Sequence, residues 1–443
     1  MTTVDVGAVI DEGRWTSYQK LLIAGTALTI ILDGVDNQLL PNALPTLMRE
    51  WSLPRGAFQN VLAVGPFGMM IGGAVGGMLG DRIGRRTALL LSVLAFAVLT
   101  LAIAMANSMF MLGLLRFLAG VGLGGAMPNA AALASEYVPR RQRPFAVTLT
   151  IVCIPLGGTL AALLAGRVLP VYGWRGLFLI GGLIPVVLAL VLFKVLPESP
   201  RFLAGRRERW GELRAMLRRI GHDVPDDATF VEAPGVGAAA GKPQASMASI
   251  FAPALRLDTI GLFGAFFFCL MANYIGFLLI PAMLTGAGFP PVVGTNANAA
   301  FNFGGVAGAI FGALVIQQLG SRATMLGMSA LAIVSAIVMA LTPIEVDETT
   351  RLIAMFAVTG GLLNAVQTTM YALAAHVYPT DIRGTGVGAA VGFGRIGNVL
   401  AAYAGNFALD RGGTAGYFSS WAVTMSLVLG SLALVRRHIP PSR

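Results

Sequence analysis

Twelve apolar runs, each long enough to cross a membrane as a helix, constrain this chain more than any other feature. About 20 apolar residues in a helix span the hydrocarbon core of a bilayer. The runs have the approximate limits 18–46, 57–80, 87–106, 109–137, 144–168, 174–196, 257–284, 292–319, 323–343, 349–378, 384–409 and 415–435. Only 12% of the 443 residues are charged, against about 25% in soluble domains. The sequence therefore predicts an all-α integral membrane protein with twelve transmembrane helices, and it excludes a soluble globular enzyme.

The basic residues indicate the orientation of the chain. If the N-terminus faces inward, the inward segments hold 23 Lys and Arg residues and the outward loops hold six. Cytoplasmic loops carry this excess, so we expect both termini to be cytoplasmic. The net charge of +10 is then an orientation signal and implies no nucleic-acid partner. Acidic Asp5, Asp11 and Glu12 precede the first run in place of a basic segment, which predicts a retained helix and not a signal peptide.

A constant offset of 240 residues relates the two halves of the chain. Gly80 matches Gly320 and Arg82 matches Arg322, and further Gly, Pro and Phe matches keep the same register. Two six-helix halves related by a repeat are typical of transporters, whose substrate site lies near the membrane midplane between the halves.

The repeat also predicts the domain organisation. We expect one six-helix bundle at 1–196 and a second, with a short tail, at 257–443. The segment 197–256 between them is predicted to be cytoplasmic. Its first part, 201–221, is amphipathic and basic, which predicts a helix along the inner membrane face. The Gly/Ala/Pro-rich part, 233–249, is typical of a flexible linker.

Four ionisable residues lie deep inside the spans, where a charge is costly and indicates function. Asp33 and Asp36 are three residues apart, on one face of the first helix. Two carboxylates in a low dielectric repel each other, so this pair predicts proton exchange. Arg116 and Arg395 lie at mid-depth, and an arginine there suits a substrate carboxylate. The alternative is an internal salt bridge between Arg116 and one of the two acids.

Further polar residues in the second half are candidates for substrate binding: Asn302, Gln367, Tyr371 and Asn398, with Asn364 and Tyr403 as weaker candidates. Phenylalanines lie near them in sequence at positions 267, 268, 303 and 393. Amides beside ring faces would suit an aromatic, hydroxylated acid. Phenylalanines of membrane helices commonly face lipid or the protein core, so this argument is weaker than that from the charges.

Charged residues at the inner ends of the helices predict a cytoplasmic gate of ion pairs. The candidates are Asp81, Arg82, Arg85, Arg86, Glu136, Arg143, Arg322 and Arg383. Acids in such loops do not serve orientation, which makes Asp81 with Arg82 and Glu136 the most informative of them. His376 occupies the position equivalent to Glu136, and we expect it to be a hydrogen-bonding residue at a helix end.

Other function classes find little support in the sequence. The two cysteines, Cys153 and Cys269, lie far apart in apolar runs and predict no metal site and no disulfide. Neither a P-loop nor a zinc-protease motif is present, which argues against ATP-driven transport and against a membrane enzyme. A sensor built on a transporter fold would need a signalling domain, which we do not expect here.

Several motifs together resemble the major facilitator superfamily. Residues 76–86 (GGMLGDRIGRR) resemble its signature after helix 2, residues 116–124 (RFLAGVGLG) its helix 4 motif, and residues 197–202 (PESPRF) its signature after helix 6. The DGVD sequence at 33–36 and the GRIG sequence at 394–397 are similar to motifs of the aromatic acid:proton symporters.

This resemblance implies a bacterial inner-membrane permease that imports benzoate-like acids by alternating access. It assigns proton coupling to Asp33 and Asp36 and substrate binding to Arg116 and Arg395. It implies protons as the coupling ion. We expect no other cofactor and a monomer in the lipid bilayer. The second half reads Gly-Ser-Arg at 320–322 and lacks the acid equivalent to Asp81, so we expect an asymmetric gate. Sugar porters share the PESPRF segment, which leaves a sugar or another organic acid as alternative substrates.

Overall fold

Nine long helices dominate the computed structural model, which describes residues 3–225, 228–231, 247–379 and 382–441. In the described part of the chain, each of them is long and apolar enough to cross a membrane. They are α2 (Ser17–Glu50), α3 (Gln59–Ile83), α4 (Arg85–Ile103), α5 (Met109–Glu136), α6 (Arg143–Val195), α9 (Arg256–Gly286), α10 (Pro291–Leu341), α11 (Thr349–Val377) and α12 (Arg383–Leu434). The prediction of a helical membrane protein is confirmed.

Three of these helices exceed 50 residues, and each is broken at one glycine. Gly173 in α6, Gly320 in α10 and Gly413 in α12 have positive φ angles of 63°, 75° and 57°. Glycine adopts this region without the steric cost that other residues meet. The breaks separate the long helices at the boundaries that the sequence predicts between neighbouring runs. That there are twelve membrane crossings stays a prediction.

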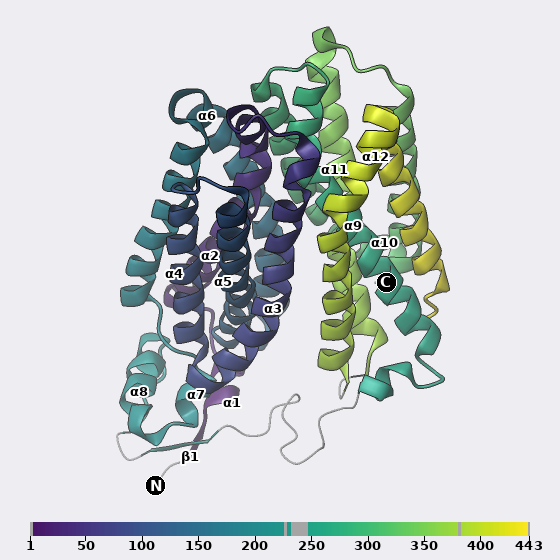
Figure 1. The fold of residues 1–443 in the computed structure, drawn as a ribbon. Coiled ribbons are helices and arrows are strands. Elements are labelled where there is room, and N and C mark those ends of the chain that lie inside the picture. The colour runs from purple at the N-terminus through teal and green to yellow at the C-terminus, as the bar shows by residue number, and fades with distance from the viewer. Residues whose placement is uncertain (1–2, 226–227, 232–246, 380–381, 442–443) are drawn as a thin grey trace.

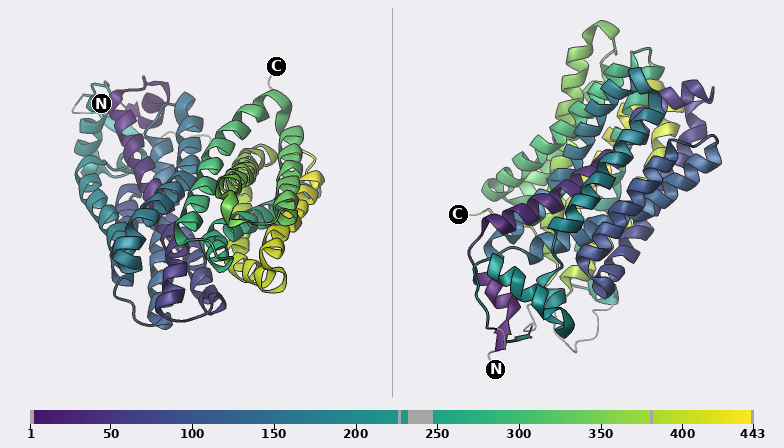
Figure 2. Two further views of the ribbon diagram at one scale, coloured as in Figure 1. Left: turned by 90° about the horizontal axis from the view of Figure 1, so that it is seen from above. Right: turned by 90° about the vertical axis from the view of Figure 1, so that its left-hand side faces the viewer.

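The helices form two bundles that lie side by side (Figures 1 and 2). The N-half contains α2–α6 and the C-half contains α9–α12. The 240-residue offset recurs in the structure: α6 and α12 begin at Arg143 and Arg383, and they break at Gly173 and Gly413. The two halves are therefore structural repeats.

Glycines let α3 and α5 pack with their backbones in contact. A Cβ atom at Gly72 would overlap the backbone of Val121, and one at Gly76 would overlap Gly125. The Asn129 side chain then links the two helices, because its Nδ2 donates to the Gly76 carbonyl at 2.8 Å. Small residues at such interfaces permit close helix packing in membranes.

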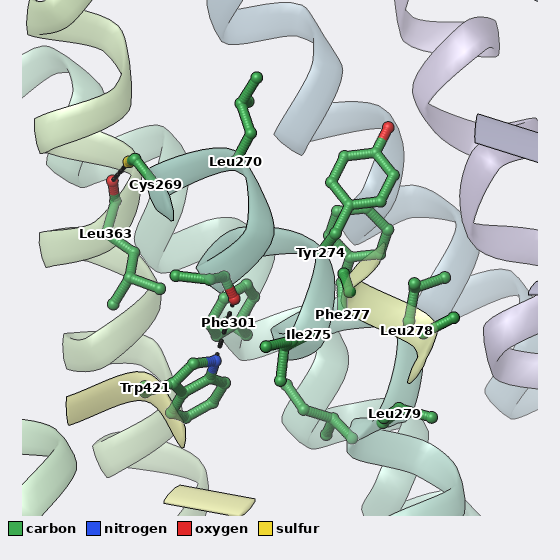
Figure 3. Close-up of a cluster of buried hydrophobic side chains, with 14 of the residues drawn as sticks. Cys269, Leu270, Tyr274, Ile275, Phe277, Leu278, Leu279, Phe301, Leu363 and Trp421 are labelled. Atoms are coloured by element: carbon green, nitrogen blue, oxygen red, sulfur yellow. Dashed lines mark hydrogen bonds between the residues drawn. The ribbon is translucent and has the colours of Figure 1, made fainter. Parts of the chain in front are cut away.

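Aromatic side chains fill the core of the C-half (Figure 3). Trp421 stacks on Phe301 with the ring centroids 5.6 Å apart, and its indole N–H donates to the Ala272 carbonyl at 3.0 Å. Because this bond satisfies the polar edge of the ring, the tryptophan can be fully buried.

A small cap covers one end of the N-half (Figure 1). It consists of β1 (Thr3–Asp5), α1 (Val6–Glu12), α7 (Pro200–Ala204), α8 (Trp210–Arg219) and β2 (Thr229–Val231). The two short strands pair in parallel, which is a small departure from the all-helical prediction.

The cap corrects the prediction for 201–221. Leu213, Met216 and Leu217 of α8 are buried in protein, against partners that include Val6 and Ile10 of the N-terminal segment. An amphipathic pattern shows that one face is covered but not what covers it, and here the cover is protein rather than lipid. Most of the linker predicted at 233–249 lies outside the described residues.

Among the described residues, five short 3₁₀ turns complete the fold: η1 (Arg55–Phe58), η2 (Arg140–Gln142), η3 (Arg207–Arg209), η4 (Met247–Phe251) and η5 (Val346–Glu348). We call the end of the bundles that carries the cap the inner end, and the opposite end the outer end. The C-terminal segment also packs at the inner end, where the Ile439 carbonyl accepts from the Ser321 backbone N–H at 2.9 Å. Both termini therefore lie on one side, and its assignment to the cytoplasm stays a prediction.

Candidate functional site

A cavity lies between the two halves, and side chains from both of them line it. The N-half contributes Asp33, Gly34, Asn37, Gln38, Pro66, Met69, Met127, Ile154 and Pro155. The C-half contributes Leu270, Asn273, Tyr274, Phe277, Phe301, Asn302, Asn364, Gln367, Thr368, Tyr371, Val391, Arg395 and Asn398. The lining combines amides, aromatic rings and two charged groups, as in many small-molecule sites.

The two charged groups of the cavity come from opposite halves. Asp33 of α2 is 3% exposed, and Arg395 of α12 is half-buried. Within the described part of the chain, no ion pair or hydrogen bond joins them, although both face the same space. A ligand in the cavity can therefore meet a cation on one side and a carboxyl group on the other.

Asp36 and Arg116 form an ion pair outside this cavity. Arg116 Nη1 lies 3.3 Å from Asp36 Oδ2, and the Thr100 hydroxyl donates to Asp36 Oδ1. Both charged side chains are buried inside the N-half, among α2, α4 and α5. This is the internal salt bridge that the sequence left as an alternative. The roles of Asp36 in proton coupling and of Arg116 in substrate binding stay predictions, and this position does not favour them.

Amide side chains join the halves on the outer side of the cavity. Asn298 Nδ2 donates to Gln38 Oε1 at 3.0 Å and to Asn42 Oδ1 at 3.2 Å. Gln38 Nε2 in turn donates to Asn302 Oδ1 at 3.3 Å. Nearby, Asn37 Nδ2 donates to the Tyr274 hydroxyl at 3.1 Å.

Further bonds connect the halves at the outer end. Arg55 pairs with Asp410 and donates to Asn406 Oδ1 at 2.7 Å, while the Tyr403 hydroxyl donates to Asn60 Oδ1 at 2.9 Å. The hydrogen bonds that the described residues make between the halves lie at the level of the cavity and toward the outer end.

Comparisons with known proteins identify this architecture. The sequence model of the Major Facilitator Superfamily matches residues 26–402. The chain belongs to the Major Facilitator Superfamily. It is 31% identical to the gallate transporter of Pseudomonas putida, over 92% of this chain and 90% of that protein. It is 30% identical to the 4-hydroxybenzoate transporter PcaK of Acinetobacter baylyi, over 96% and 91%.

A solved structure supports the same fold. The D-xylose-proton symporter superposes with a TM-score of 0.67 at 16% identity, covering 96% of this chain and 99% of that one. Membership of the superfamily confirms the predictions of a multi-pass membrane transporter and of a protein that is not an enzyme.

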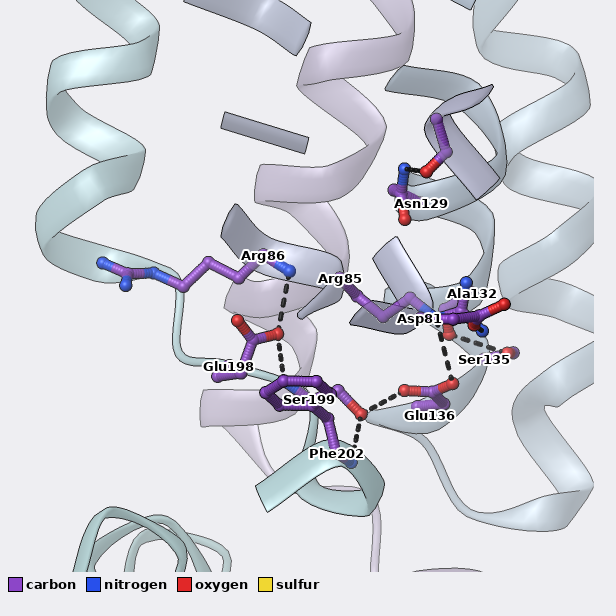
Figure 4. A network of polar contacts seen from close by, with 11 residues as sticks. Asp81, Arg85, Arg86, Asn129, Ala132, Ser135, Glu136, Glu198, Ser199 and Phe202 are labelled. Atoms are coloured by element: carbon purple, nitrogen blue, oxygen red, sulfur yellow. Dashed lines mark hydrogen bonds and ion pairs between the residues drawn. The ribbon is translucent and has the colours of Figure 1, made fainter. Parts of the chain in front are cut away.

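The superfamily signature after helix 2 builds a polar network at the inner end (Figure 4). Arg85 Nη2 pairs with Asp81 Oδ1 at 2.7 Å, and Arg85 Nε lies 3.9 Å from Glu136 Oε1. The Ser199 hydroxyl donates to the other oxygen of Glu136. The sequence pointed to Asp81 with Arg82 and Glu136, but the structure brings Arg85 between the two acids.

Glu198, which the sequence did not single out as a site residue, anchors the same network. Its carboxylate accepts from the Arg86 backbone N–H at 2.8 Å, the Ser199 N–H at 2.9 Å and the Thr87 hydroxyl at 3.3 Å. Glu198 is buried, so it fixes the end of α6 against the start of α4. Glu198 belongs to the PESPRF motif, and this motif could have indicated its importance.

The other gate candidates do not join this network in the described part of the chain. Arg143 pairs with Asp11 of the cap, and Arg383 Nε donates to the Tyr378 carbonyl at 3.4 Å. Arg82 offers its backbone carbonyl to Arg206 Nη2 at 3.2 Å. With the described residues as partners, no hydrogen bond is found for the side chain of Arg322, or for that of His376, which is exposed at the end of α11. Gating by these residues stays a prediction.

The cavity contains residues that the sequence did not single out: Asn37, Gln38, Asn273, Tyr274, Phe277 and Phe301. Asn273 is equivalent to Asp33 in the 240-residue repeat, and this equivalence could have predicted that Asn273 lines the cavity. The predicted residues Asn302, Gln367, Tyr371 and Asn398 do line the cavity, together with Asn364. Phe303 and Phe393 instead point outward and are 61% and 41% exposed.

Neutralising one partner of the Asp36–Arg116 pair is expected to destabilise the fold. Asp36→Asn leaves a buried arginine without its counter-ion, which costs about 3–5 kcal/mol. Arg116→Gln leaves the buried carboxylate alone and should cost a similar amount. Thermal unfolding of the purified variants in detergent measures the effect. The double variant should lie closer to the wild type than either single one, and strictly additive losses would contradict a pair.

Proposed function

We propose that this chain is a proton-coupled secondary transporter that imports aromatic carboxylates across the bacterial inner membrane by alternating access. The observation that carries the proposal is the placement of Arg395 and Asp33 on opposite sides of one cavity between the halves. The names of the relatives support the substrate class, since they transport gallate and 4-hydroxybenzoate.

Arg395 is the group for the substrate carboxylate. A guanidinium binds a carboxylate through two parallel, charge-assisted hydrogen bonds. The aromatic walls of the cavity, among them Tyr274, Phe277 and Phe301, suit the ring. A neutral sugar would leave the half-buried Arg395 cation without a counter-ion, which disfavours the sugar alternative.

Two amide oxygens are available for ring hydroxyl groups. Asn273 and Asn398 both line the cavity, and the Oδ1 atom of each is buried without a hydrogen-bond partner in the described part of the chain. Asn273 Nδ2 is already used, because it donates to the Cys269 carbonyl at 3.1 Å. An unpaired buried acceptor is costly, so a ligand with hydroxyl donors would be favoured over one without them.

Asp33 is the group that binds and releases the coupled proton. An ionised Asp33 repels a substrate carboxylate in the same cavity, whereas a protonated Asp33 does not. Proton binding and substrate binding therefore favour each other, and this coupling is reciprocal. A proton gradient can then drive accumulation without a metal or organic cofactor. We further propose that the protein works as a monomer in the lipid bilayer.

Uptake by cells that express the protein tests the substrate class. Radiolabelled 4-hydroxybenzoate should accumulate, and excess gallate or benzoate should inhibit its uptake. D-xylose and succinate should not inhibit. Uptake of xylose or succinate in place of the aromatic acid would overturn the substrate class, and binding without any uptake would favour a sensor.

A further inference from the structure

Arg395 makes a contact with the opposite half that the proposed function does not require. Its side chain crosses from α12 to α3, where Nη1 donates to the backbone carbonyl of Met69 at 3.0 Å. Other hydrogen bonds between the halves join uncharged cavity residues, such as Gln38 with Asn302 and Asn37 with Tyr274, or lie toward the outer end. This one is made by the cation of the cavity.

Gly73 provides the space in which the guanidinium lies. A Cβ atom at Gly73 would overlap Arg395 Nη1 and would lie 3.4 Å from Cζ. On the same helix, a Cβ atom at Gly77 would have no atom within 4 Å. Gly72 and Gly76 differ from both, because they face the backbone of α5. A Cβ atom at Gly73 would lie 3.5 Å from the Gly124 carbonyl of α5, which is an ordinary contact, so the overlap it would cause is with Arg395.

We propose that Gly73 and the Met69 carbonyl form a resting site for the Arg395 guanidinium, and that the substrate carboxylate must draw the guanidinium away from it. This inference rests on the proposed role of Arg395 in substrate binding. One hydrogen bond to a neutral carbonyl is weaker than two charge-assisted hydrogen bonds to a carboxylate, so the guanidinium binds the substrate in preference to the Met69 carbonyl. Gly73 is a positioning residue, since it acts through Arg395.

The competition has a mechanical consequence. When the substrate binds, it breaks a hydrogen bond between α3 and α12, and when it leaves, that bond re-forms. A ligand shifts a conformational equilibrium by its different affinity for the two states. Occupancy of the cavity is thereby linked to a contact between the halves that move against each other.

Gly73→Ala is expected to tighten substrate binding and to slow transport. The methyl group excludes the guanidinium from α3, so the substrate no longer competes with the Met69 carbonyl. We expect the Kd and KM for 4-hydroxybenzoate to fall about three- to fivefold. Vmax per inserted protein should fall as well. In the wild type, the hydrogen bond from Arg395 to the Met69 carbonyl re-forms as the substrate leaves and favours its release, and in the variant this bond cannot form. A methyl group that only disturbed packing would lower Vmax without lowering Kd.

The test compares Gly73→Ala with Gly77→Ala, in the full-length protein, by calorimetric binding of 4-hydroxybenzoate and by uptake kinetics. Gly77→Ala should match the wild type. Gly73→Ala should have no further effect on Kd in an Arg395→Lys background. Gly73→Ser, which has the same Cβ atom, should shift Kd in the same direction if the alanine variant gives too little folded protein.

Two results would overturn the inference in different ways. If Gly73→Ala binds no more tightly than Gly77→Ala, while Arg395→Lys weakens binding, the resting site is wrong and the proposed function survives. If the wild type does not bind the acid, or Arg395→Lys binds it equally well, the proposed function fails and the inference fails with it.

Discussion

Arg395→Ala is expected to weaken binding of 4-hydroxybenzoate about a hundredfold or more. Removing one partner of a buried charged pair costs about 2–5 kcal/mol, and each 1.4 kcal/mol is a factor of ten in Kd. In the described lining of the cavity, the only other charged side chain is the carboxyl group of Asp33, which cannot replace the cation. Both KM and Kd for the acid should therefore rise.

A matched control lies on the same helix. Arg411 is also an arginine of α12, but it lies beyond the cavity near the outer end, over the ring of Phe407. Arg411→Ala should bind and transport like the wild type. Binding by calorimetry, with amounts corrected for folded protein, distinguishes the two variants. If the Arg395→Ala protein binds the acid with wild-type affinity, Arg395 does not bind the substrate carboxylate.

Asp33→Asn is expected to abolish proton-driven accumulation while substrate exchange continues. Asparagine has nearly the shape of a protonated aspartate and carries no titratable proton. The substrate can still bind to Arg395 and cross the membrane with the moving halves. What is lost is the link between substrate and proton, so uptake should stop at the equilibrium concentration instead of rising above it.

The control for this variant is Asp223→Asn. Asp223 is an exposed acid near the cap that pairs with Arg218, far in the structure from the cavity. Its neutralisation should leave accumulation unchanged. Asp36→Asn tests the other member of the DGVD motif, and its defect should appear in the yield of folded protein.

The helices and the repeat could be predicted from the sequence because they follow from local patterns. Each apolar run became a helix or a segment of one, and α6 and α12 begin and break in the same register. The site residues on helices that face the cavity could also be found, since polar residues in a span are few. Arg395, Asn302 and Gln367 are examples.

The different roles of Asp33 and Asp36 could not be predicted, because they depend on how the halves meet. Three residues along a helix leave two side chains only about 60° apart around its axis. That angle is enough to direct Asp33 into the cavity and Asp36 toward Arg116 inside the N-half. Helical periodicity places both on one face and does not show where the boundary between two bundles runs.

The residues that pack against the apolar face of α8 could not be predicted for a similar reason. Its basic, amphipathic pattern suits a membrane surface and a protein surface equally well. The partner is the N-terminal segment, about 200 residues away in sequence, and a single sequence holds no signal for that contact.

Proton flux during substrate movement tests the central claim most directly. Proteoliposomes of the wild type and of Asp33→Asn would be given labelled 4-hydroxybenzoate, with and without an inwardly directed proton gradient, while an internal pH dye is recorded. The wild type should accumulate the acid and acidify the lumen as it enters. Asp33→Asn should exchange internal for external acid at a comparable rate, with no accumulation and no proton signal. Gradient-driven accumulation by Asp33→Asn, or accumulation by the wild type without proton entry, would contradict the account.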